Sequence, residues 1–308
     1  MVGVSPSGFT LMQFFFEVLV GGLLSGVMYS LAALGFVLIY KASGVFNFAQ
    51  GAMVYFAALS FVGILAKGVP FGIALVLALA VMILFGVLTE RFVLRPLVNQ
   101  PPISLFMATI GLAFFLEGLG PFLWGNESHE IRLGIPDEPL PWFLERYNIA
   151  ISTFDLSAAV IAGVLVAGLA LFFQKTKIGR ALRAVADDHQ AALSIGIPLQ
   201  TIWMIVWGVA GFVALVAGLL WGARNGVQLA LVSVVLKALP VLILGGFTSV
   251  PGAIVGGLII GSTEKLAEVY IGPLVGGGLE SWFPYVLALA FLLIRPEGLF
   301  GERHIDRV

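Results

Sequence analysis

Long apolar stretches that contain no Asp, Glu, Lys or Arg are the main pattern along this chain of 308 residues. A helix needs about 20 apolar residues to cross the hydrocarbon core of a bilayer, which is roughly 30 Å thick. Seven stretches can hold such a helix: residues 18–40, 42–66, 68–89, 96–116, 156–174, 189–223 and 238–263. The pattern therefore predicts at least seven membrane-spanning segments.

Two weaker stretches bring the expected count to eight or nine transmembrane helices. Residues 228–246 are interrupted by Lys237, and residues 280–294 are short but begin with the aromatic residues Trp282 and Tyr285, which suit the headgroup level. None of the stretches alternates apolar with polar residues, which is the pattern of a membrane β-barrel. We expect an all-α polytopic membrane protein with a single transmembrane domain over residues 1–308.

The composition excludes a water-soluble protein. Hydrophobic residues make up 60% of the chain and charged residues 11%, whereas a soluble domain has about 25% charged residues. The chain has 0 Cys and 3 scattered His, which excludes disulfides and thiolate metal sites. It has no basic tract, no phosphate-binding loop and no HExxH motif, so we expect neither nucleic-acid binding nor an enzyme activity of its own.

The basic residues predict the orientation in the membrane, because loops rich in Lys and Arg stay in the cytoplasm. With nine spans, the loops on one side hold Lys41, Arg91, Arg95, Lys175, Lys177, Arg180, Arg183, Arg295, Arg303 and Arg307. The loops on the other side hold Lys67, Arg132, Arg146 and Arg224. We therefore expect an extracytoplasmic N-terminus and a cytoplasmic C-terminus.

Two loops are long enough to have a role. Residues 125–153, on the expected outer side, contain three Pro in a stiff run, and they form either a docking surface for an extracytoplasmic protein or a solvated connection. In residues 174–198, on the inner side, apolar positions after Gly179 recur at helical spacing: Leu182, Val185, Ala186, Leu193 and Ile197. We expect a short amphipathic helix there, with its apolar stripe covered by lipid headgroups or by another protein.

Glycine occurs 38 times and repeats at four-residue spacing in Gly22 and Gly26, Gly218 and Gly222, Gly252 and Gly256, and Gly257 and Gly261. Small residues let membrane helices approach closely, so we interpret these pairs as structural.

Two regions combine Gly with polar residues inside apolar sequence: residues 41–53 and 244–257. Backbone that leaves the helix at membrane depth is tolerated only where protein or a water-filled cavity satisfies its hydrogen bonds, so we expect discontinuous helices along a transport path. Asn47 and Gln50 could hydrogen-bond a polar solute or could instead hold two helix segments together. The candidate path residues are Asn47, Phe48, Gln50, Lys237, Gly245, Gly246 and Pro251.

Lys237 is the deepest charge that the sequence predicts. Glu264, Lys265 and Glu268 are expected near the outer end of their span, where long side chains can reach water. No carboxylate is evident at the depth of Lys237, and an unpaired charge in a span marks a functional site.

Four stretches stand out: YSLAALGFVLIY with NFAQG (29–40 and 47–51), GRALRAVADDHQAALSIGI (179–197), KALPVLILGGFTSVPGAIVGG (237–257) and RPEGLFG (295–301). In this order they resemble the permease subunits of the branched-chain amino acid ABC transporters. The resemblance implies the all-helical ABC importer permease fold, in the inner membrane of a bacterium. It also implies a second permease subunit, two ATP-binding subunits that hold ATP and Mg, an extracytoplasmic solute-binding protein, and no cofactor in this chain.

The second stretch resembles the cytoplasmic segment by which such permeases dock on their ATPases. This resemblance implies that the residues that couple the permease to the ATPases are Gly179, Arg180, Arg183, Asp187, Asp188, Ala191 and Gly196. Gln50 stands where the family has His, which leaves the solute open among branched-chain amino acids, urea, short amides and aromatic acids.

Two other functions compete with an ATP-driven importer subunit. A self-sufficient channel or ion-coupled carrier for urea or an amide would need ionisable residues that face one another near the midplane. A structural scaffold would have no need of two regions of broken helix.

Overall fold

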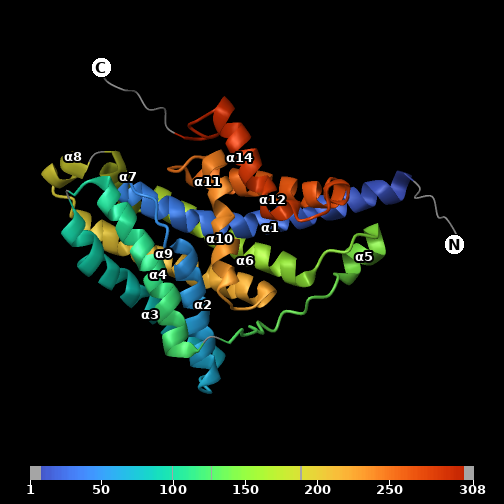
Figure 1. Ribbon diagram of the computed structural model, residues 1–308, viewed down its shortest axis with the longest axis horizontal. Coiled ribbons are helices and arrows are strands. Elements are labelled where there is room, and N and C mark those ends of the chain that lie inside the picture. The colour runs from blue at the N-terminus through green and yellow to red at the C-terminus, as the bar shows by residue number, and fades with distance from the viewer. Residues whose placement is uncertain (1–7, 99, 126, 188, 302–308) are drawn as a thin grey trace.

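The computed structural model describes residues 8–98, 100–125, 127–187 and 189–301, and within these ranges every regular element is a helix (Figure 1). The α-helices are α1 (Gly8–Ser43), α2 (Gln50–Ala66), α3 (Phe71–Leu88), α4 (Pro102–Trp124), α5 (Pro141–Tyr147), α6 (Thr153–Lys175), α7 (Lys177–Asp187), α8 (His189–Ser194), α9 (Leu199–Asn225), α10 (Ala230–Leu236), α11 (Ala238–Gly245), α12 (Val250–Tyr270), α13 (Gly272–Val275) and α14 (Phe283–Ile294). A π-helix (Thr89–Leu94) and two 3-10 turns (Arg95–Leu97 and Leu279–Ser281) complete the list.

Five helical segments of the described chain are long and apolar enough to cross a membrane: Leu11–Ser43, Phe71–Leu97, Pro102–Trp124, Thr153–Lys175 and Leu199–Asn225. The bent pair Ala230–Gly245 and Val250–Tyr270 makes a sixth if it counts as one span. The all-α multi-pass fold is thus confirmed, but the count of eight or nine is not. Two expected spans are too short, since α2 has 17 residues and α14 has 12.

Large apolar side chains on the outward faces of α3, α4 and α6 are exposed, as expected of helices that face lipid. They include Val76, Leu84, Phe114, Phe122 and Val164. A soluble monomer rarely exposes so much contiguous apolar surface. The exposure therefore agrees with the membrane fold that the composition predicts.

Helix α1 is the central element, and its 36 residues make it about 54 Å long. Gly22 and Gly26 lie against Gly257 and Gly261 of α12, and a Cβ on Gly26 would lie 2.5 Å from the carbonyl oxygen of Gly257. These glycines let the two backbones touch, which confirms the structural interpretation of these two pairs.

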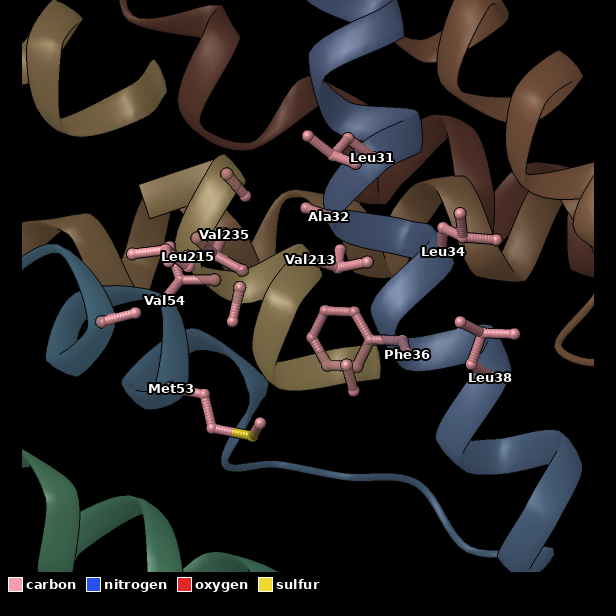
Figure 2. Close-up of a cluster of buried hydrophobic side chains, with 14 of the residues drawn as sticks. Leu31, Ala32, Leu34, Phe36, Leu38, Met53, Val54, Val213, Leu215 and Val235 are labelled. Carbon is pink, nitrogen blue, oxygen red and sulfur yellow. The ribbon is translucent and has the colours of Figure 1, made fainter. Parts of the chain in front are cut away.

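The core on the other side of α1 is apolar. Figure 2 shows Phe36 of α1 with Val54 of α2, Val213 and Leu215 of α9, and Val235 of α10, all of them buried. The short helix α10 is thus held by its apolar side against α2 and α9.

The two ends of the bundle are told apart by the contacts that α1 makes there, and they are named below after the orientation that the basic residues predict. At one end, Gln13 and Glu17 of α1 hydrogen-bond the backbone at Tyr147 and Ala150 of the long loop. At the other end, Lys41 lies beside α7 and the bend between α11 and α12. We call these the outer and the inner end.

Candidate functional site

Asn47 shapes the turn between α1 and α2. Its Oδ1 accepts a hydrogen bond from the backbone N–H of Ala49 at 3.1 Å, and its Nδ2 donates to Oε1 of Gln50 at 3.4 Å. Both side chains are completely buried. This geometry favours the alternative in which the two amides hold helix segments together, although it leaves their role in transport a prediction.

Gln50 has one donor without a partner. Its Nε2 is buried and has no hydrogen-bond partner among the described residues. It lies against Gly35 of α1, where a Cβ would overlap the amide. Phe48, also a candidate path residue, is half-buried, and its backbone N–H donates to Thr109 of α4 at 3.3 Å.

Lys237 has a carboxylate partner, so the expectation that it is unpaired is wrong. Its Nζ donates to Oε1 of Glu264 at 2.9 Å, and the hydroxyl of Tyr29 donates to the same oxygen at 3.2 Å. Glu264 is only 2% exposed, so it does not reach water at the outer end of its span as predicted. Because the chain bends before α12, Glu264 lies at the same depth in the bundle as the junction of α10 and α11. The number of residues between the two positions does not reveal this.

These groups lie near mid-depth in the bundle. Tyr29 follows Gln13 by 16 residues and precedes Lys41 by 12 on one continuous helix, which corresponds to about 24 Å and 18 Å of helix length. The network is thus far from both ends of α1.

A line of polar groups continues from this network toward the outer end. The ring of Tyr29 stacks on Trp221 of α9 with centroids 5.2 Å apart. Arg224, three residues further along α9, forms an ion pair with Asp155 of α6 at 2.7 Å. We call Asp155, Arg224, Tyr29, Glu264 and Lys237 the polar track.

The outer end of the polar track opens into a cavity of about 770 Å³, which we call the outer cavity. Its walls are residues 128–137 of the long loop, the first turn of α6 and the segment 223–228 that ends α9. The loop is tied down on both sides, by backbone pairing of His129 with Val227 and of Pro139 with Ser152. Residues 130–138 therefore form a strap over the cavity.

The bend between α11 and α12 lies at the inner end, where the sequence predicts a break. Gly246 has φ +103°, and a Cβ on Gly245 would overlap the backbone of Gly252. The two helices meet at 115°, and Pro251 is exposed in the first turn of α12.

Residues 298–301 close this bend, which sequence reasoning missed. The N–H of Leu299 donates to the carbonyl of Leu244 at 2.8 Å, and that of Phe300 donates to Gly245 at 3.1 Å. The RPEGLFG motif (295–301) was the available signal, because its two Gly supply the backbone freedom that this contact needs.

Helix α7 is seated on the end of α6. Leu182 and Val185 are buried, and Nη1 of Arg183 donates to the carbonyl of Phe173 at 2.8 Å. A Cβ on Gly179 would overlap that same carbonyl. The bundle itself therefore covers the first half of the apolar stripe, where lipid or another protein was expected.

The other predicted coupling residues lie toward the surface. Arg180 and Asp187 are exposed, as is Ala191 of α8, whose carbonyl accepts from Ser194. Gly196 has φ +83° and ends the segment. The described parts of the expected helix are α7 and α8, and Asp188, which stands between them in the sequence, lies outside the described residues.

Apolar surface remains on the second half of the segment, at Leu193 and Ile195. Helix α7 also shares a cavity of about 210 Å³ with the bend, which we call the inner cavity. It is lined by Lys41, Gly179, Leu182, Arg183, residues 248–251 and Phe300, among others, and Nζ of Lys41 donates to the carbonyl of Thr248 at 3.4 Å.

Comparison with known proteins agrees with this architecture. The family model described as "Branched-chain amino acid transport system / permease component" matches residues 18–295. The high-affinity branched-chain amino acid transport system permease protein LivH of Escherichia coli K12 is 26% identical over 306 residues, and BraD of Pseudomonas aeruginosa is 27% identical over 305. Each alignment covers 96% of this chain and 98% of the relative. A probable LivH of Methanocaldococcus jannaschii is 29% identical over 92% of both chains.

Proposed function

Because the chain belongs to the family of branched-chain amino acid transport system permease components, we propose that it is the transmembrane permease subunit of an ATP-driven, binding-protein-dependent importer. Its solutes would be branched-chain or related amino acids, in keeping with the printed names of the LivH and BraD relatives. The chain itself would carry out no chemical reaction.

The observation that carries the proposal is the shared inner cavity. It places the seat of α7 beside the bend between α11 and α12. A force applied to the exposed surface of α7 at the inner end would therefore reach the bend between α11 and α12 directly. A ligand or partner shifts an equilibrium only if it binds the two states with different free energies, so the surface must interact with the two ATP states differently.

The proposed partners follow from this arrangement. Two ATP-binding subunits, holding ATP and Mg, would dock at α7 and α8, where Arg180 and Asp187 offer charge and Leu193 and Ile195 offer apolar contact. A second, homologous permease subunit and membrane lipid would cover the exposed apolar faces. An extracytoplasmic binding protein would deliver solute to the outer end.

The inner end would face the cytoplasm of a bacterial cell, with the protein in the inner membrane, and the N-terminus would lie outside. Solute would then enter at the outer end, and access would alternate as ATP closes and opens the ATPase pair.

Reconstitution with the partner subunits tests the proposal. We expect ATP-dependent leucine uptake by the complete assembly, and loss of uptake relative to ATP hydrolysis in Arg180→Glu and Asp187→Lys. These exposed positions are better choices than Arg183, because Arg183 holds α7 on α6. Arg91→Glu, an exposed position outside α7 and α8, is the matched control. Wild-type uptake in both inner variants would contradict the coupling role.

One observation favours a second candidate, a self-sufficient channel or ion-coupled carrier for a small polar solute such as urea or an amide. Lys237 and Glu264 form the mid-depth pair of ionisable groups that such a carrier needs. The purified chain alone in liposomes distinguishes the two functions: flux of urea or leucine without ATPases, driven by an ion gradient, would support the carrier.

A further inference from the structure

We propose that the outer cavity is a binding site for a zwitterionic α-amino acid, with the carboxylate at Arg224 and the ammonium at Asp155. The inference rests on the proposed function, which it extends by naming the charge class of the solute and the place where the permease first holds it.

The size of the cavity suits a free amino acid. Its volume of about 770 Å³ lies within the 300–1,000 Å³ that is usual for small-molecule sites. The space is bounded by the strap on one side and by the ends of α6 and α9 on the other, and it is partly open to the outside.

Both signs of charge line the cavity. Asp155 and Arg224 form an ion pair at 2.7 Å, and their side chains keep 20% and 27% exposure, so each retains hydrogen-bonding capacity toward the cavity. Glu130 and Arg132 of the strap repeat the two signs in exposed positions. With Asp137, the lining holds three acidic and two basic groups, so an anion or a cation alone would meet like charges there, whereas a zwitterion can satisfy both signs.

An apolar wall lies next to the charges. Ile131 and Phe154 line the cavity and are 7% and 6% exposed, and Ile135 of the strap is half-buried there. These side chains offer an aliphatic substituent a place out of water, next to the groups that would hold its ammonium and carboxylate. A neutral amide such as urea would gain little from either feature.

The strap is held at both of its ends and turns at a glycine. It is fixed at His129 and at Pro139, and Gly134 in its middle has φ +74°, a conformation that Gly adopts without strain. Asp137 accepts a hydrogen bond from the hydroxyl of Ser152, which fixes the far side of the strap to the turn before α6.

The cavity shares Asp155 and Arg224 with the polar track. Arg224 lies three residues beyond Trp221, whose ring stacks on Tyr29, and the hydroxyl of Tyr29 donates to Glu264, the partner of Lys237. Charges of alternating sign thus follow one another from the outer cavity toward the α10–α11 junction. A zwitterion leaving the outer cavity would find the same pairing of charges at mid-depth.

The test is equilibrium binding of radiolabelled leucine to the full permease assembly in lipid nanodiscs, without binding protein or ATP. We expect saturable binding that is competed by isoleucine but not by urea. Asp155→Asn and Arg224→Gln should each weaken it by about tenfold or more, since each removes one charge-assisted hydrogen bond. The double variant Asp155→Asn/Arg224→Gln keeps a neutral hydrogen-bonding pair and should bind no better than either single variant.

Two analogues separate the roles of the charges. Leucinamide lacks the carboxylate and should be insensitive to Arg224→Gln, while 4-methylpentanoate lacks the ammonium and should be insensitive to Asp155→Asn. Arg146→Gln, an exposed outer-end cation outside the cavity lining, is the control and should bind leucine as the wild type does. The thermal unfolding midpoint of each variant shows whether it is folded.

Wild-type leucine affinity in folded Asp155→Asn and Arg224→Gln would overturn the site. So would the lack of saturable leucine binding to a wild-type assembly that still imports leucine with its binding protein, and that result would leave the proposed function standing. Failure of the complete assembly to import any amino acid would instead refute the proposed function.

Discussion

Lys237 and Glu264 meet across a 115° bend, with Nζ of the lysine 2.9 Å from Oε1 of the glutamate. The lysine lies before the bend and the glutamate after it, and Tyr29 of α1 donates to the same carboxylate oxygen. The ion pair therefore fixes the two halves of the discontinuous helix to each other and to the central helix.

Glu264→Gln should destabilise the protein strongly. It leaves the ammonium of Lys237, whose side chain is 19% exposed, without its counter-charge. Breaking a fully buried pair costs about 3–5 kcal/mol, which is the upper bound for this variant. The measurement is the free energy of unfolding in mixed micelles, followed by circular dichroism. Glu280→Gln is the control, because its pair with Lys265 is wider, at 3.5 Å, and about half exposed, so a loss of about 1 kcal/mol or less is expected. An equal loss of unfolding free energy in the two variants would show that the Lys237–Glu264 pair stabilises the protein no more than the exposed pair does.

Gly26→Ala should loosen the contact of α1 with α12. The added Cβ would lie 2.5 Å from the carbonyl oxygen of Gly257, so the helices must separate, and overpacking of this kind costs about 1–3 kcal/mol. Gly21→Ala, on the same helix, is the control, since a Cβ there meets nothing within 4 Å. The measurement is the free energy of unfolding of both variants in mixed micelles. Similar values for the two variants would argue against close packing at Gly26.

Gly179→Ala should detach α7 while leaving the spans intact. A Cβ at this position overlaps the carbonyl of Phe173, which Arg183 also binds, so α7 cannot keep its seat on α6. We expect normal insertion and helicity but loss of co-purifying ATPase subunits. Gly168→Ala in α6, where a Cβ meets nothing within 4 Å, should retain them. Full retention of the ATPases by Gly179→Ala would contradict the docking surface.

The chain has 0 Cys, so single cysteine substitutions report the orientation in the membrane without background. Glu145→Cys in α5 should react in intact cells with a maleimide that cannot cross the membrane. Lys175→Cys at the end of α6 should react only after the membrane is opened. Both positions are exposed at opposite ends of the bundle, and the reverse labelling pattern would invert the proposed topology.

The apolar stretches predict the fold class well because lipid imposes one requirement, a continuous run of apolar residues, on every span. The two expected breaks occur where Gly and polar residues interrupt such runs, after Ser43 and after Gly245. The close packing of Gly22 and Gly26 follows from their spacing alone. Each of these features depends on residues that are near one another in the sequence.

Features that depend on distant residues were not predictable in the same way. Glu264 was expected near water because depth was counted along an unbroken span, and the partner of Lys237 lies 27 residues away, beyond a bend whose angle no local pattern gives. The sequence does not show that α6 covers α7, because which helix covers an amphipathic stripe depends on how the chain returns to α6. The polar track likewise draws on four separate helices and the α10–α11 junction.

Leu299 and Phe300 follow α14 in the chain and hydrogen-bond the last carbonyls of α11, so the order of synthesis bears on how this protein matures. Until Leu299 and Phe300 have been synthesised, the carbonyl oxygens of Leu244 and Gly245 lack these donors, and a buried backbone group left without a partner costs about 1–3 kcal/mol. A nascent chain can thus insert its spans while the bend between α11 and α12 still lacks these two hydrogen bonds. A chain that stops before Leu299 would contain every helix from α1 to α14 and would still lack the hydrogen bonds that close the bend.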